Sequence, residues 1–181
     1  MVRPHLRLRP PQPPAPVRPA ATVLLVRDGD AGLEVLMTRR SARASFAPGA
    51  YVFPGGAIDE ADRDAAHDPA LAWRPDQDET LRPALLAAVR ESFEELGVLL
   101  ARDAHGRWVD PATLAALDRH GPLLPQCRTH GLTLALDALW WLAHWITDRD
   151  LPKRFDVPFF IARMPPDQTP QADNREQFEP I

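Results

Sequence analysis

The nine residues that carry most information about this chain read Arg90-Glu91-Ser92-Phe93-Glu94-Glu95-Leu96-Gly97-Val98. In an α-helix, which turns by about 100° per residue, Glu91, Glu94 and Glu95 fall within an arc of roughly 100°. They also lie directly before Gly97, a residue type that often ends a helix in the left-handed conformation. The helix dipole disfavours each carboxylate at this end by about 0.3–1 kcal/mol. The sequence therefore predicts a helix end at which three carboxylates repel one another.

This unfavourable arrangement has two interpretations. A divalent cation would offset the repulsion, because hard ions such as Mg²⁺ take oxygen ligands, and Arg90 could orient Glu94 one turn further along the helix. Alternatively, the three glutamates form an acidic, solvated helix face with one ion pair. The sequence before the helix favours the first interpretation.

Upstream of the helix the chain carries Phe53-Pro54-Gly55-Gly56, followed by Asp59 and Asp62. With the helix, these residues resemble the Nudix box, G-x5-E-x7-R-E-U-x-E-E-x-G-U, where U is an aliphatic residue. Gly56 fits its first glycine, Asp62 its first acidic position, and Arg90 to Val98 its second half. Three departures are visible: Asp62 replaces a glutamate, Ser92 takes an aliphatic position, and 27 residues separate Asp62 from Arg90 where the box has seven. The added length falls in a loop, where closure cost grows slowly with length.

A second similarity lies just before the box. Leu36-Met37-Thr38-Arg39-Arg40-Ser41, with Gly49 and the Phe-Pro-Gly-Gly run, resembles the coenzyme A signature of Nudix hydrolases, although Ser45 stands where that signature has an arginine. Trp145-Ile146-Thr147 and Arg154-Phe155-Asp156 extend the resemblance. It is greatest to the acyl-coenzyme A diphosphatases, whose Nudix box is split by a long insert.

The resemblance implies hydrolysis of a diphosphate with Mg²⁺ or Mn²⁺, most specifically that of coenzyme A or acyl-coenzyme A. It implies metal ligands at Glu91, Glu94 and Glu95, and catalytic roles for Arg90, Glu91 and Glu94. Substrate contacts are expected at four positions: Arg40, Ser41, Gly55 and Gly56. The general base could be Glu91 or a later carboxylate, Glu176 or Glu179. Two alternatives stay open: a Nudix hydrolase of ADP-ribose, NADH or a nucleotide sugar, and a catalytically silent domain that binds a nucleotide.

The expected fold is α+β, the Nudix α/β/α sandwich with a mixed central sheet. Residues 1–20, rich in proline and arginine, are expected to form a disordered arm, and residues 21–181 the Nudix domain. Within this domain, residues 63–89 form the insert, including the start of the catalytic helix. Because the family fold usually closes with a strand and a helix, the chain is expected to be truncated within that last strand, and a homodimer could cover the exposed face.

Local patterns predict the elements of this domain. Thr80 is expected to cap the catalytic helix, and Pro54-Gly55-Gly56 to form a turn whose backbone approaches a phosphate. Residues 63–79 show no period and are expected to be irregular. The expected strands are 21–26, 33–38, 51–53, 98–101, 107–109, 140–147 and 155–164, the last broken at Pro158; further helices are expected from Asp110 to near Gly121 and over 132–139.

Composition excludes several classes of protein. The 181 residues carry a net charge of −4 with a pI of about 5.8, which argues against nucleic-acid binding. The single cysteine, Cys127, excludes an internal disulfide and a cysteine-cluster metal site, and no apolar run reaches the length of a membrane span. We expect a cytoplasmic protein whose partner is a small nucleotide, and we assign its aromatic residues to the core.

Overall fold

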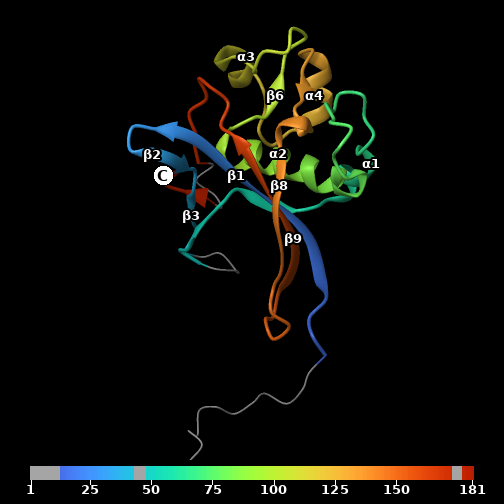
Figure 1. The fold of residues 1–181 in the computed structure, drawn as a ribbon, viewed down its shortest axis with the longest axis vertical. Helices are drawn as coiled ribbons and strands as arrows, with labels where there is room; N and C mark the ends of the chain where they lie inside the picture. Colours follow the sequence, from blue (N-terminus) through green and yellow to red (C-terminus); the bar gives the residue numbers. More distant parts are fainter. Residues whose placement is uncertain (1–12, 43–47, 173–176) are drawn as a thin grey trace, which may run out of the picture.

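The structure, a computed structural model, describes residues 13–42, 48–172 and 177–181. Its centre is a mixed sheet in the order β2-β1-β9-β8, with β5 also paired to β1 (Figure 1). β1 runs parallel to β9 and antiparallel to β2 and β5, and β8 and β9 form an antiparallel hairpin. The mixed sheet expected for this fold is therefore confirmed. Its strands are β1 Val17–Gly29, β2 Gly32–Val35, β5 Gly55–Ala57, β8 Trp140–Ile146 and β9 Arg154–Arg163.

Helix α2 (Arg82–Leu96) crosses behind the strands in Figure 1 and packs on β1 and β5. The apolar stripe predicted for it, namely Leu85, Val89, Phe93 and Leu96, is buried throughout. These side chains join Val23, Leu25, Phe160 and Ala162 of the sheet in one core cluster. Helix α2, which carries the carboxylates, is thus held in place by its packing on β1 and β9.

The two ends of α2 differ in how well the sequence predicted them. Gly97 ends the helix with φ 67°, as expected, and the buried Ser92 hydroxyl donates to the carbonyl of Val98 at 3.0 Å. At the start, Thr80 is not the cap. Asp78 accepts hydrogen bonds from the backbone N–H and hydroxyl of Thr80, because a 3₁₀ turn, η1 (Glu79–Leu81), precedes the α-helix.

Residues 63–79 are packed against the body of the molecule. After helix α1 (Glu60–Asp64), the chain reaches Arg74 and Gln77. Arg74 donates to the carbonyls of Asp137 and Leu139, and Gln77 Nε2 donates to Leu136 O at 2.9 Å. These bonds anchor a segment without regular periodicity to the residues just before β8.

The helix expected over 132–139 is wrong. That segment contains β7 (Thr133–Leu134), which pairs with β6 (Ala101–Arg102), and the 3₁₀ turn η2 (Leu136–Ala138). The remaining helices are α3 (Pro111–Ala115), which ends before the expected limit at Gly121, and α4 (Leu123–Thr129).

Two further differences concern strands. Pro158 does not interrupt β9, which passes through it in register with His144. β1 begins at Val17, within the stretch that we assigned to the N-terminal arm. A small second sheet has the order β10-β3-β4, formed by β3 Thr38–Arg40, β4 Tyr51–Val52 and β10 Gln177–Phe178.

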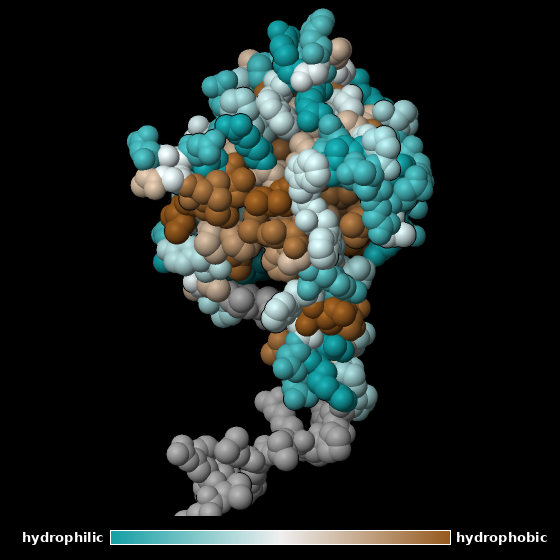
Figure 2. All heavy atoms as spheres, in the orientation of Figure 1, coloured by the Kyte–Doolittle hydropathy of each residue, from teal (hydrophilic) through white to brown (hydrophobic). Residues whose placement is uncertain are grey.

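The β8–β9 hairpin projects with the start of β1 beyond the body of the molecule (Figure 1). Figure 2 shows apolar surface over the strands of the body and again on this projection. The exposed apolar side chains there belong mainly to β2 and β8: Leu33, Val35, Trp140, Trp141, Leu142, Trp145 and Ile146. None of the helices in the described part of the chain has the length and apolar character needed to cross a membrane.

Candidate active site

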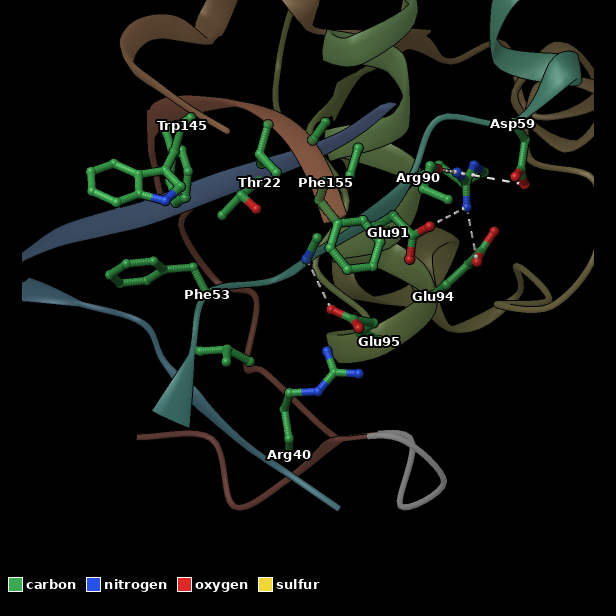
Figure 3. Close-up of a pocket in the computed structure, with 18 of the residues that line it drawn as sticks. Thr22, Arg40, Phe53, Asp59, Arg90, Glu91, Glu94, Glu95, Trp145 and Phe155 are labelled. Carbon is green, nitrogen blue, oxygen red and sulfur yellow. Dashed lines mark hydrogen bonds and ion pairs between the residues drawn. The ribbon is translucent and has the colours of Figure 1, made fainter. Parts of the chain in front are cut away.

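Arg90 lies at the centre of a cluster of carboxylates at the middle of α2 (Figure 3). Its Nε and Nη2 donate to the two oxygens of Asp62 at 3.1 and 2.9 Å, and its Nη1 donates to Glu91 at 2.8 Å and to Glu94 at 3.3 Å. Nη2 also reaches the carbonyl of Ala57 at 2.9 Å. The i,i+4 contact to Glu94 was expected; the sequence did not indicate that Arg90 would also join α2 to α1 and β5.

Asp62 explains how the two halves of the motif meet despite the 27 residues between them. Its side chain is 3% exposed, and besides Arg90 it binds the backbone N–H of Asp59 at 2.9 Å. The single carboxylate of Asp62 therefore accepts a hydrogen bond at the first turn of α1 and also holds the Arg90 side chain in position. The shorter aspartate is sufficient because α1 packs directly against α2.

Burial acts on both members of the Arg90–Glu91 pair. Burial raises the pKa of Glu91 to about 7, against the lowering effect of Arg90. Burial disfavours the charged form of Arg90, but its bond to Asp62 and the charges of Glu91 and Glu94 outweigh this and raise its pKa above the usual value. Arg90 is therefore a permanent cation that offsets part of the negative charge on this face of α2.

Gly55 and Gly56 bring β5 close to the carboxylates. They lie in a strand, so the turn that we predicted there is wrong. Gly55 donates its N–H to Glu95 at 3.1 Å. A Cβ at Gly56 would overlap the carboxylate of Glu91, and one at Gly55 would overlap the carbonyl of Ala21. Gly55 therefore allows β5 to lie close to β1, and Gly56 allows it to lie close to the Glu91 side chain of α2.

Arg119 binds the C-terminal end of α2. Its Nε donates to Phe93 O at 3.0 Å and its Nη2 to Glu94 O at 2.8 Å. A cation on these last carbonyls offsets the negative end of the helix dipole next to the glutamates. No local pattern predicts this contact, because Arg119 follows the helix by more than twenty positions.

The cluster opens into a pocket of about 770 Å³. Gly55, Gly56, Arg90 and all three glutamates of α2 line it, and so does Arg40, which reaches in from β3 (Figure 3). The Nε of Arg40 is buried and has no hydrogen-bond partner among the residues that the structure describes. A buried cationic donor without a partner suits an anionic ligand.

Other residues expected at the site lie elsewhere. Ser41 is not among the residues that line the pocket. Glu179 is half exposed and pairs with Arg39 at 3.1 Å, also away from the pocket lining. Ser45 and Glu176 lie outside the described residues.

The far side of the pocket is aromatic. The lining there includes Phe53, Phe155, Phe159 and Trp145, with Lys153 from the turn between β8 and β9. We assigned these aromatic residues to the core, and this expectation is wrong for those that line the pocket. No local pattern could have identified them, because they are brought together by pairing between distant strands.

The donors of the site fit a hard divalent cation, since three glutamate side chains line one pocket. In the described residues no three acidic, histidine or cysteine side chains already converge as a metal site. Instead, Arg90 binds Glu91 and Glu94, and the N–H of Gly55 binds Glu95. The three glutamates are thus held by donors of the protein, and the single Arg90 guanidinium offsets part of their charge.

Comparisons with known proteins agree with this geometry. A family model described as the NUDIX domain matches residues 16–127. The human acyl-coenzyme A diphosphatase NUDT19 is 31% identical over 185 aligned residues, which cover 75% of this chain and 49% of the human protein. The chain therefore spans about half the length of this curated relative.

Solved structures extend the similarity. The crystal structure of a NUDIX hydrolase from Alicyclobacillus acidocaldarius matches with a TM-score of 0.78 and 31% identity, over 92% of this chain and 78% of that one. A MutT/nudix family protein from Enterococcus faecalis shares the fold at 13% identity and a TM-score of 0.53, over 98% of this chain and 46% of that one. From the carboxylate cluster, the mixed sheet and these matches, we conclude that the chain belongs to the Nudix hydrolase family.

Proposed function

We propose that this protein hydrolyses the diphosphate bond of coenzyme A or acyl-coenzyme A with the help of Mg²⁺ or Mn²⁺. The observation that supports this most is the combination, in one pocket, of the three α2 glutamates with Arg40. The carboxylates suit a divalent ion, and the Arg40 guanidinium suits the phosphates that such an ion would accompany.

Two observations favour coenzyme A among the diphosphates. The human relative that is 31% identical is named an acyl-coenzyme A diphosphatase. In addition, Arg40, Phe53, Gly55 and Gly56, which belong to the stretch that resembles the coenzyme A signature, all line the pocket. The activity of the longer relative is carried over to this chain as a proposal only.

In the proposed reaction, Glu91, Glu94 and Glu95 would hold the metal, while Arg90 orients Glu91 and Glu94. A divalent ion held there would supply charge neutralisation at the phosphate oxygens and a lower pKa for a bound water. Arg40 binds a substrate phosphate, and Gly55 and Gly56 leave room for the ligand beside β5. We propose Glu91 as the proton acceptor, because it lines the pocket whereas Glu179 does not; the third candidate, Glu176, lies outside the described residues.

The test is phosphate release, coupled to a phosphatase, across coenzyme A, acetyl-coenzyme A, ADP-ribose, NADH and a nucleotide sugar, each with Mg²⁺ and Mn²⁺. We expect metal-dependent cleavage of the coenzyme A species, lost in Glu94→Gln. Glu34→Gln, on the exposed β2, is the matched control and should keep full activity. If the protein cleaves ADP-ribose, NADH or the nucleotide sugar but not the coenzyme A species, its substrate is another nucleoside diphosphate.

No cleavage of any substrate, combined with nucleotide binding, would favour a silent binding domain. The cytoplasmic location, the homodimer and the lack of nucleic-acid binding remain predictions from the sequence.

A further inference from the structure

Part of the pocket lining, on the side away from Arg90, consists of two rows of residues that each cross four strands. One row runs Gly55–Thr22–Phe159–Ala143 from β5 through β1 and β9 to β8. In the next row Ala57 pairs with Ala20 and Val157 with Trp145. Ala20 lies opposite Val157 because the pairs on either side, Pro19–Asp156 and Thr22–Phe159, have the same register. Seven of the eight residues in these two rows line the pocket, all but Ala143. We call the two rows the trough.

The trough leads away from the carboxylates. It begins at Gly55, whose N–H binds Glu95, and it ends at Trp145 on the edge strand. Three strand spacings separate the two ends, which corresponds to about 14 Å. Figure 3 shows Trp145 and Phe53 together at the end of the pocket opposite Arg90 and Asp59. A ligand held at the glutamates can therefore extend one of its two halves along the trough.

The end of the trough is aromatic and basic. Trp145 is 67% exposed although it lines the pocket, so one surface of its ring is available to a ligand. Lys153 lines the same end, from the turn that joins β8 to β9. Arg18 on β1 pairs with Phe155 and lies two residues before Ala20, on the same face of the sheet. The end thus combines a stacking surface with positive charge.

We propose that the trough binds the adenosine half of the substrate, with the base against Trp145 and a phosphate on the ribose bound by Lys153. This inference rests on the proposed function, because coenzyme A carries such a phosphate whereas ADP-ribose and NADH do not. The pantetheine half has no charge to match Lys153. Bases stack favourably on aromatic side chains, and an ammonium–phosphate contact is a charge-assisted hydrogen bond.

The test uses two fragments that contain no diphosphate, adenosine 3′,5′-bisphosphate and AMP. Their binding to the whole protein is measured by isothermal titration calorimetry. We expect the bisphosphate to bind about tenfold more tightly than AMP, the difference that a single charged hydrogen bond contributes. Lys153→Met should abolish this difference and leave AMP binding unchanged. Trp145→Ala should weaken both fragments about equally.

Arg149→Met is the matched control, because Arg149 is exposed in the same turn and does not line the pocket. It should keep the tenfold difference, and Lys153→Arg should restore most of it. Equal binding of the two fragments by the unchanged protein, or an unchanged ratio in Lys153→Met, would overturn the inference, as would a protein that binds neither fragment.

The fragment measurement stays separate from the proposed function because neither ligand has a bond for the enzyme to cleave. If the protein hydrolyses coenzyme A but binds the bisphosphate no more tightly than AMP, the proposed function stands and the proposed subsite is refuted. A preference for the bisphosphate without hydrolysis would retain the subsite and remove the enzymatic function.

Discussion

The carboxylate of Asp62 binds the guanidinium of Arg90 through both of its oxygens, at 3.1 and 2.9 Å, and the Asp62 side chain is almost completely buried. This pair joins α1 to the middle of α2. The arrangement of the site depends on it, because the same guanidinium binds Glu91 and Glu94.

Asp62→Asn should therefore lower the free energy of unfolding by about 2 kcal/mol, since it weakens a buried pair whose arginine keeps other carboxylate partners. Urea unfolding measures the effect. Asp28→Asn removes the partner of Arg163 in a fully exposed pair of similar length and should change stability by less than about 0.5 kcal/mol. Equal effects of the two substitutions would mean that burial of the Asp62 pair has no energetic consequence.

The adjacent glycines of β5 should respond differently to alanine. Gly55→Ala pushes against the backbone of β1 and should cost about 1–3 kcal/mol of stability. Gly56→Ala pushes against the Glu91 side chain, which can move. It should cost less than about 1 kcal/mol but lower kcat by about a hundredfold, because it displaces Glu91, the proposed metal ligand and proton acceptor. Unfolding curves and rates for both variants check this, and the reverse order would contradict the packing that we describe.

Gln168 holds the segment after β9 to the chain that follows α2. Its side-chain amide accepts from the N–H of Leu99 at 2.9 Å and donates to the carbonyl of Leu99 at 3.1 Å, and the residue is buried. Gln168→Ala removes the bond of the buried Leu99 N–H, whereas the Leu99 carbonyl keeps the N–H of Ala101 at 3.0 Å. The change should cost about 1–3 kcal/mol. Gln171→Ala is the control, because the exposed Gln171 makes its bond to Leu96 through the backbone. A loss confined to Gln171→Ala would refute this prediction.

Cys127 should be unreactive in the folded protein. It is fully buried, and burial raises the pKa of its thiol to about 11, so that on the order of one molecule in a thousand carries the thiolate at pH 8. A chromogenic disulfide reagent at pH 8 should label less than about a tenth of the protein in the time that it labels all of it in denaturant. Rapid labelling without denaturant would show that α4 opens readily.

The sequence was sufficient for the parts of the site that depend on local chemistry. The spacing of Glu91, Glu94 and Glu95 before Gly97 predicted the helix, its end and its crowded face. The Gly-Gly run was misread as a turn, because both of its neighbours, β1 and α2, come from other parts of the chain. The alternation of Leu132, Leu134 and Leu136 has the period of a strand, and our prediction of a helix there overlooked it.

The aromatic end of the pocket could not be predicted from local patterns. Trp145 and Phe155 read as core residues in isolation, and they face the pocket only because β9 lies between β1 and β8 in one register. That register sets Val23 beside Phe160. Residues so far apart in the chain pair in this register because the whole sheet becomes buried in one arrangement. A short window of sequence contains no information about that arrangement.

The parallel pairing of β1 with β9 also sets an order of events during synthesis. The strand that carries Thr22 leaves the ribosome early, as does the helix that carries the glutamates, but neither can complete the pocket until Arg154–Arg163 has been made. Non-local pairing of this kind is slow, and until it occurs the central edge of β1 stays unpaired and open to other strands. The nascent chain is therefore most exposed to aggregation in the interval before β9 emerges, and a chaperone that binds extended apolar segments would act on β1 during that interval.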